Sequence, residues 1–479
     1  MEKFFSKHKK LFLAIILALA VFFRFWHIAS IPPGLFTDEA MNGSNAVEAI
    51  DTGEYKVFYQ ENNGREGLFI NIQALSVKAF GTKPWALRII SGIFGTLTVL
   101  GLYLLTKQLF NKESVALLSS FFLATSFWHI NFSRIGFRAI MAPFFLVWSF
   151  YFLFKIINQT KNNFQSWLLP IFAGFIFGLG FHSYIAYRVA PILLIPPFIL
   201  LLKNKKIKLI ALFLIGAFIA ILPLGLYFLN HPQDFMGRTT QISIFASQSP
   251  IFNLIKNTLI TLQMFFFAGD FNWRHNYAGF PQLFPVVAVM FFVGILISIK
   301  KIFKKENVGL TLVYLFLAMW FIFMLAPVVV SNEGLPHSLR SITLAPIAMI
   351  FAGLGAEYFG NKITTKKTAI IFAILLIIIP VFTYFQYFVF WAKKPEVAKS
   401  FSKEYTDIAY QINSMNRTKP VYVIIDKNRI FRDDPMDLQT IMFITRTFLP
   451  QQQKEKNIFY STYKDSGNIP QDAQKIWLK

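Results

Sequence analysis

Long apolar segments, separated by short lysine-rich or longer polar connections, cover most of the chain. A helix needs roughly 20 mostly apolar residues to cross a bilayer, and about eleven segments approach that length. These candidate spans lie at 11–28, 86–106, 114–130, 139–157, 167–183, 189–202, 209–229, 284–299, 309–330, 341–358 and 368–390. The pattern predicts an all-α polytopic membrane protein with about 11 transmembrane helices.

Segment 251–268 and the first span, 11–28, differ from the other apolar segments. Segment 251–268 is apolar but carries several polar side chains, which favours an interfacial or re-entrant helix. The first span follows Lys7, Lys9 and Lys10, and no small-residue cleavage site is evident after it. We therefore expect the first span to be a retained anchor and not a removed signal peptide.

Composition narrows the class of protein. The chain is 55% hydrophobic and 15% charged, whereas soluble domains are about 25% charged. Cysteine is absent, which excludes disulfides, thiolate metal sites and cysteine nucleophiles. The net charge of +23 is compatible with nucleic-acid binding, but the lysines that produce it lie in short connections between spans. Membrane topology explains them, so we expect no nucleic-acid partner.

The basic residues divide by type between the two faces of the membrane. Basic residues in short loops mark the inner face, and with the N-terminus inside, every basic residue of the inner loops, from Lys107 to Lys367, is a lysine. All thirteen arginines fall in outer loops, at outer helix ends or in the tail. We predict a multi-pass protein of the cytoplasmic (inner) membrane whose N-terminus is inside and whose C-terminal tail is outside.

The outer arginines suggest a chemistry for the outer face. Lysine suffices as a topological point charge, whereas the rigid guanidinium fork of arginine matches phosphate and carboxylate. This distribution predicts an anion-handling outer surface. The alternative for any single arginine is that it snorkels to headgroups or pairs with a local acid.

The polar tail predicts a second domain. Residues 391–479 favour a helix near 396–415, a strand at 420–426, a helix near 435–448 and a second strand at 457–461. We divide the chain into a transmembrane catalytic domain, 1–390, whose first outer loop is 29–85, and a small extracytoplasmic α/β domain, 391–479.

The first outer loop opens with two adjacent carboxylates, Asp38 and Glu39. Carboxylates at a lipid–water boundary are costly to desolvate, and such a group suits a general base that takes a proton from an acceptor hydroxyl. The alternative is that Thr37 or Asp38 caps a helix that begins at Glu39.

Other outer loops carry further candidate residues. Glu333, His337 and Arg340 crowd an outer helix end, which favours a functional role. Asp234 and Asp270 precede Arg238 and Arg274; each acid either pairs with its neighbouring arginine or binds sugar hydroxyls. The sequence contains no phosphate-cradling glycine-rich loop and no histidine cluster with metal-ligand spacing.

An ordered set of outer motifs resembles one family. The motifs are Pro32–Glu39, Asn63–Phe69, Asn131–Arg138, His231–Arg238, Gly269–Asn276 and Ser331–Arg340. Together they resemble bacterial members of the GT-C superfamily of glycosyltransferases, family 39, which includes protein O-mannosyltransferases and aminoarabinose transferases of lipid A.

This resemblance implies inverting transfer of a sugar from a polyprenyl-phosphate donor to a protein, lipid or glycan acceptor at the outer face of the bilayer. It assigns Asp38 as catalytic base and Glu39 as its companion. Arg65 stands near a lysine of many relatives and is a candidate phosphate contact, and Glu66 is a candidate substrate or divalent-metal ligand. No cofactor other than such a metal is implied.

The remaining roles follow from the charge that grows on the leaving phosphate. Preorganised positive donors stabilise such charge, and Arg138, Arg238, Arg274, His337 and Arg340 are the candidates. For the sugar, the candidates are the acids Glu66, Asp234, Asp270 and Glu333.

Two other classes of function remain open. A secondary transporter or lipid-linked sugar flippase places ionisable residues near the bilayer midplane, whereas the centres of these spans are almost free of charge. A non-catalytic subunit of an envelope-synthesis complex would lack the base, and Asp38 is present. The sequence identifies neither the sugar nor the acceptor.

Overall fold

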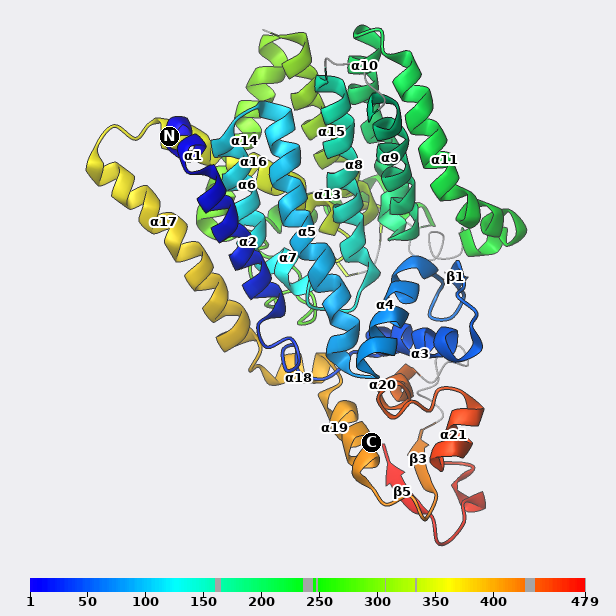
Figure 1. Cartoon of the computed structure of the whole chain (residues 1–479). Coiled ribbons are helices and arrows are strands. Elements are labelled where there is room, and N and C mark those ends of the chain that lie inside the picture. Colours follow the sequence, from blue (N-terminus) through cyan, green and yellow to red (C-terminus); the bar gives the residue numbers. More distant parts are fainter. Residues whose placement is uncertain are drawn as a thin grey trace. The chain divides into compact units, whose positions relative to one another are not determined.

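A computed structural model of the chain describes residues 1–159, 165–235, 244–246, 249–305, 307–331, 334–426 and 436–478 (Figure 1). Contacts divide the chain into two compact units. The helical unit comprises Met1–Trp26, Ser91–Arg134 and Arg138–Phe390. The mixed unit comprises His27–Ile90, Ile135–Phe137 and Trp391–Lys479.

The described residues of the helical unit form helices and the loops between them. Its α-helices are α1 (Glu2–Lys7), α2 (Lys9–Phe25), most of α5 (Pro84–Phe110), α6 (Glu113–Thr125), α7 (Phe127–Phe132), α8 (Met141–Asn158), α9 (Gln165–Leu179), α10 (Ile195–Lys203), α11 (Ile207–Asn230), α13 (Pro250–Gln263), α14 (Pro285–Lys304), α15 (Val308–Val329), α16 (Ala345–Asn361) and α17 (Lys366–Tyr384). Short 3₁₀ segments are η1 (Arg138–Ile140), η2 (Gly180–His182), η3 (Ile185–Leu194), η4 (Ile244–Ala246) and η5 (Ile342–Leu344). A π-helical turn, η6 (Phe385–Trp391), extends α17.

Eight helices among the described residues are long and apolar enough to cross a membrane. They are Pro84–Phe110, Arg138–Asn158, Ile185–Lys203, Ile207–Asn230, Pro285–Lys304, Val308–Val329, Ile342–Asn361 and Lys366–Trp391. Each coincides with a predicted span. The other three predicted spans form shorter helices: 11–28 gives α2, 114–130 is divided between α6 and α7, and 167–183 gives α9 and η2. The chain is therefore a mostly helical, multi-pass membrane protein.

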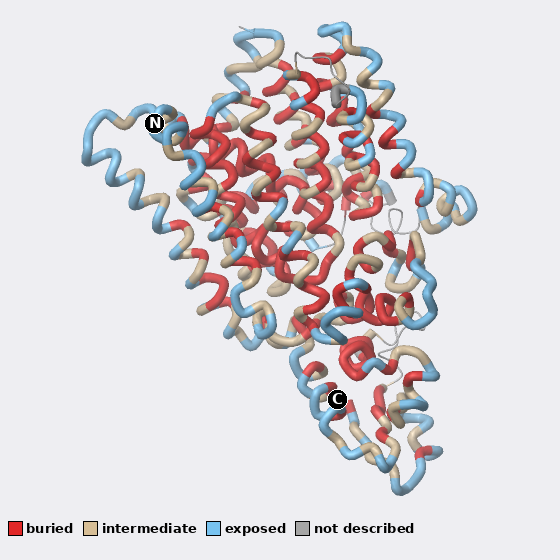
Figure 2. The backbone as a smooth tube through the Cα atoms, viewed as in Figure 1, coloured by how far each residue is buried: buried red, intermediate tan, exposed pale blue. Residues whose placement is uncertain are grey.

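Glycines let neighbouring helices of this unit approach closely. A Cβ atom on Gly294 of α14 would lie 1.8 Å from the carbonyl oxygen of Phe351 in α16, and one on Gly355 of α16 would lie 1.9 Å from that of Met290 in α14. Small residues at helix interfaces are typical of membrane bundles. The apolar window of Ile342–Asn361 is 89% buried, against 11% for Lys366–Trp391, so α16 lies inside the unit and α17 at its edge (Figure 2).

The mixed unit joins the first loop with the tail of the chain. From the loop come α3 (Thr37–Thr52), a two-stranded antiparallel hairpin of β1 (Phe58–Tyr59) and β2 (Arg65–Glu66), and α4 (Gly67–Phe80). The tail supplies α18 (Pro395–Ser400), α19 (Lys403–Ser414), β3 (Val421–Ile425), α20 (Met436–Thr445), α21 (Pro450–Lys456), β4 (Ile458–Thr462), the 3₁₀ turn η8 (Ser466–Asn468) and β5 (Gln474–Trp477).

The tail contains a small parallel sheet, as its hydrophobic pattern indicates. Its strand order is β4-β3-β5, and both outer strands pair parallel to β3. The predicted strands 420–426 and 457–461 are β3 and β4, and the predicted helix 435–448 is α20 in its described part. The predicted helix 396–415 is divided into α18 and α19 at Ser402, whose φ is +50°.

One hydrophobic core runs through both parts of the mixed unit. Leu35, Val47 and Leu87 of the first loop and the start of α5 lie in the same buried cluster as Ile412 of α19 and Phe443 of α20. Gly43 has no side chain, and a Cβ there would lie 2.5 Å from the ring of Phe443, so α3 and α20 pack tightly. The residues on either side of this core, His27–Ile90 and Trp391–Lys479, thus belong to one compact unit.

Candidate functional site

Asp38 lies in the first turn of α3 and is half-buried. One of its carboxylate oxygens accepts a hydrogen bond of 3.0 Å from the side-chain amide of Asn62. The helix begins at Thr37 and not at Glu39, so neither Thr37 nor Asp38 is the residue before it. A carboxylate in the first turn is favoured by the helix dipole.

Glu39 is held very differently from its neighbour. It is fully buried and forms two hydrogen-bonded contacts of 2.9 Å with the guanidinium of Arg88, which is also fully buried. The backbone amides of Gly136 and Phe36 donate to the same carboxylate, at 2.6 Å and 3.4 Å. A buried ion pair with these additional donors fixes the start of α3 in place.

Arg65 and Glu66 follow on β2 and are also buried. The guanidinium of Arg65 donates to the side-chain oxygens of Asn42 and Asn45, at 2.6 Å and 2.5 Å. Both asparagines are on α3, so Arg65 connects the hairpin to that helix. Glu66 precedes the first residue of α4.

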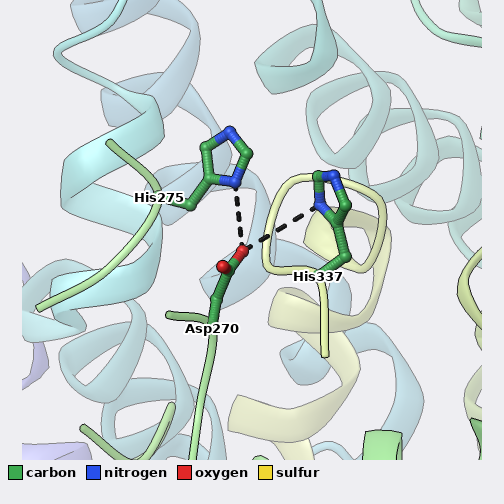
Figure 3. Close-up of side chains that lie close together, drawn as sticks. All are labelled: Asp270, His275 and His337. Carbon is green, nitrogen blue, oxygen red and sulfur yellow. Dashed lines mark hydrogen bonds and ion pairs between the residues drawn. The ribbon is translucent and has the colours of Figure 1, made fainter. Parts of the chain in front are cut away.

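The helical unit brings together an aspartate and two histidines (Figure 3). Nδ1 of His275 lies 3.0 Å from Oδ2 of Asp270, and Nδ1 of His337 lies 4.0 Å from the same oxygen. The imidazole rings face each other with centroids 4.9 Å apart. Two loops form this cluster: one connects α13 to α14, and the other connects α15 to η5.

Backbone contacts hold the carboxylate of Asp270 in position. The amide of Asn272 donates to Oδ1 and the amide of Ser338 donates to Oδ2, both at 2.8 Å. The second of these bonds joins the two loops. Asp270 thus accepts from a histidine and two backbone amides.

The charges around this cluster shift its pKa values in a consistent direction. Burial raises the pKa of Asp270, but the hydrogen bond from His275 and the charges of both histidines outweigh it, so the net pKa is lowered. Burial lowers the pKa of His275, and Arg274 and Arg340 lower it further against the effect of Asp270. At neutral pH, Asp270 is ionised and His275 is neutral.

The same three groups form a donor set that can hold a divalent cation. Their nearest ligand atoms lie within 4.8 Å of one another, and imidazole nitrogen with carboxylate oxygen is a set that suits zinc. Bound there, such an ion would add positive charge next to Arg274 and Arg340. In the described geometry the carboxylate of Asp270 instead accepts hydrogen bonds.

The remaining candidates have contacts of their own where the structure describes them. Arg340 lies beside His337, and its guanidinium contacts the hydroxyl of Ser331. Arg138 lies over the ring of Tyr184. Asp234 accepts from the hydroxyl of Tyr227 at 2.8 Å. Arg238 and Glu333 lie outside the described residues.

Sequence reasoning missed the histidine cluster because its members are far apart in the chain. His275 and His337 belong to different loops, so no local spacing reveals them. The available signal was that both histidines are close to an arginine in sequence: Arg274 directly precedes His275, and Arg340 follows His337 by three residues. The prediction instead assigned Asp270 to sugar binding and His337 to phosphate binding, and gave His275 no role.

A comparison with known families gives a match in the middle of the chain. The sequence profile of the family described as Dolichyl-phosphate-mannose-protein mannosyltransferase matches residues 68–227. This confirms the resemblance indicated by the outer motifs. No curated protein matches the chain.

Two solved structures share the fold. ArnT from Cupriavidus metallidurans bound to undecaprenyl phosphate is 11% identical with a TM-score of 0.58, over 95% of this chain and 90% of that chain. The archaeal oligosaccharyltransferase AglB from Archaeoglobus fulgidus, in complex with an inhibitory peptide and a dolichol-phosphate, is 14% identical with a TM-score of 0.55, over 97% of this chain and 70% of that chain.

Proposed function

We propose that the chain is a membrane glycosyltransferase related to the dolichyl-phosphate-mannose-protein mannosyltransferase family, whose profile matches residues 68–227. We further propose that Asp38 is the general base in an inverting transfer from a polyprenyl-phosphate sugar. The observation that carries this proposal is the contrast within the Asp38–Glu39 pair. The carboxylate of Glu39 is buried and forms an ion pair with Arg88, whereas Asp38 is half-buried.

The proposed step needs one base and no covalent intermediate. Asp38 takes the proton of the acceptor hydroxyl while the acceptor oxygen bonds to the anomeric carbon. The bond between that carbon and the phosphate oxygen breaks, and the polyprenyl phosphate leaves with the electron pair. A single carboxylate suffices for such an inversion.

Positive groups of the helical unit supply the proposed phosphate contacts. Arg274 and Arg340 lie near enough to His275 to lower its pKa, so this cluster concentrates positive charge around one carboxylate. Preorganised donors of this kind stabilise the charge that grows on a leaving phosphate. The two solved relatives contain undecaprenyl phosphate and dolichol-phosphate, which supports a polyprenyl phosphate as the lipid.

We further propose that the donor and acceptor are used at the outer face of the cytoplasmic membrane. The lysine-only inner loops support a topology with the N-terminus inside and the tail outside. The acceptor is a hydroxyl-bearing protein, lipid or glycan.

A flippase or transporter is the second candidate, but the described charges do not favour it. Glu357 lies near the end of α16 and pairs with Lys112 at 2.9 Å. Arg24 lies in the last turn of α2 and donates to backbone carbonyls. Ionisable groups at helix ends suit a surface site better than a path through the bilayer.

Proteoliposomes distinguish the two functions. Purified protein is reconstituted with a radiolabelled polyprenyl-phosphate sugar and a cell-envelope extract as acceptor. A glycosyltransferase moves the label to the acceptor and releases polyprenyl phosphate. Intact donor that appears in the opposite leaflet, without released polyprenyl phosphate, would identify a flippase and overturn the proposal.

A further inference from the structure

Successive backbone groups of the segment just before Asp38 form hydrogen bonds with side chains. The guanidinium of Arg88 donates to the carbonyl oxygens of Pro32 and Gly34, at 2.8 Å and 2.7 Å. The amide of Phe36 donates to Glu39. Between them lies Leu35, whose amide and carbonyl groups both form hydrogen bonds with the tail.

Two buried threonines of the tail hold Leu35 from both sides. The amide of Leu35 donates to the hydroxyl of Thr406 in α19 at 2.9 Å, and the hydroxyl of Thr440 in α20 donates to the carbonyl oxygen of Leu35 at 3.0 Å. The hydroxyl of Thr406 also donates to the carbonyl oxygen of Ser402 at 3.2 Å. It is therefore used as donor and acceptor at once, which fixes its direction.

Steric contacts keep the tail against this segment. Gly34 has φ of +78°, and a Cβ there would lie 2.5 Å from the carbonyl oxygen of Phe401. On α3 itself, the hydroxyl of Ser44 donates to Gln439 of α20 at 3.0 Å. The segment cannot shift along the tail without breaking several of these contacts together.

We propose that Thr406 and Thr440 are positioning residues, whose hydroxyls hold Leu35 and thereby set the position of Asp38 three residues later. The inference rests on the proposed role of Asp38 as base. By this inference, the tail supports the loop that carries the proposed base. A displacement of about 1 Å at a reacting group can cost about 100-fold in rate, so loss of either hydroxyl lowers turnover.

The test replaces each threonine by valine, which keeps the shape and removes the hydroxyl, and by serine, which restores it. Thr445→Val is the matched control, because Thr445 is a buried threonine of α20 whose hydroxyl bonds to Ile441 and Thr447 and not to Leu35. We expect Thr440→Val and Thr406→Val to lower kcat by about 10- to 100-fold with donor KM unchanged. Thr440→Ser and Thr406→Ser should restore most of the lost kcat. Thr445→Val should change kcat little, even where it lowers thermal stability as much as the other valine variants do.

A second readout does not depend on activity. In Thr406→Val, amide hydrogen exchange of Leu35 is expected to rise, whereas in Thr445→Val it stays at the wild-type rate. If the wild type transfers no sugar, the proposed function fails, and this exchange measurement still decides whether the threonines hold the loop. Wild-type kcat in both valine variants, an equal loss of kcat in Thr445→Val, or unchanged exchange at Leu35 would overturn the positioning role.

Discussion

Two neighbouring carboxylates, Asp38 and Glu39, occupy opposite environments, and this difference separates their roles. Glu39 has no exposed surface and is surrounded by Arg88 and two backbone amides. Asp38 has one short contact, from the amide of Asn62, and a partly exposed surface. This contrast underlies the proposal that Asp38, and not Glu39, takes part in proton transfer.

Stability measurements should therefore distinguish the two acids. Glu39→Gln leaves the buried guanidinium of Arg88 without its counter-charge, and removing one partner of a buried pair costs about 3–5 kcal/mol. Asp38→Asn keeps an oxygen that can accept from Asn62 and loses only the interaction with the helix dipole, so it should cost at most about 1 kcal/mol. The measurement is thermal unfolding of the purified protein in detergent. Equal stability of Glu39→Gln and wild type would show that the pair does not hold the loop.

The His275–Asp270 pair predicts a pH dependence of stability. The pKa of His275 is lowered in the folded protein, so the unfolded chain binds the proton first as pH falls. Neutral His275 therefore contributes to the free energy of unfolding above the ordinary histidine pKa of about 6.5. This contribution is lost as the pH falls from there toward the pKa of His275 in the folded protein. His275→Asn keeps a donor for Asp270 but does not titrate.

The loss of stability between about pH 7 and pH 5 should thus be smaller in His275→Asn than in the wild type. Melting temperature against pH measures it, with a chelator present so that no metal ion competes for the imidazole. Parallel curves for the two proteins would show that protonation of His275 does not oppose folding.

Residue pairings were harder to predict than residue identities. Asp38, Glu39, Asp270, His337 and Arg340 are all visible in the sequence as candidates. Their partners are not, because the contacts of Asp270 cross from one loop to another, and Leu35 reaches Thr406 across 371 residues. Spacing rules describe neighbours on one helix or strand and give no information about such long-range contacts.

At the scale of elements, close helix packing depends on glycine. The interface between α14 and α16 has Gly294 and Gly355 against backbone carbonyls of the opposite helix. Gly225 in α11 differs, since a Cβ there meets only a side chain of its own helix, 4.0 Å away. The two sites provide a matched pair of substitutions.

Gly294→Val should destabilise the helical unit, and Gly225→Val should not. A Cβ at residue 294 would overlap the carbonyl oxygen of Phe351, so the helices must separate, at a cost of about 1–3 kcal/mol or more. Folded yield and melting temperature in detergent measure the effect. Similar values for both variants would contradict the importance of this interface.

The hydrophobic pattern predicted the elements well where helices are long. All eight long apolar helices were expected, because a membrane span requires a continuous apolar segment. The pattern overestimated 114–130, since the helix breaks at Ser126, which has extended backbone angles. It also missed β5, whose alternating burial extends over only four residues.

At the scale of the whole molecule, the absence of cysteine allows a direct test of topology. Lys464 in the tail and Asn204 in a predicted inner loop are both exposed. In intact cells, Lys464→Cys should react with a membrane-impermeant thiol reagent, and Asn204→Cys should react only after lysis. Labelling in the opposite order would reverse the topology and move the proposed site to the inner face.

The most direct test of the central claim is a single-turnover measurement on Asp38→Asn with the donor already bound. General base catalysis contributes about 10²- to 10⁴-fold, so the variant should bind the polyprenyl-phosphate sugar with wild-type affinity and transfer it slower by that factor. Asp407→Asn, which removes an exposed carboxylate of the same unit, is the charge-matched control and should transfer normally. Transfer by Asp38→Asn at the wild-type rate would contradict the assignment of Asp38 as the base.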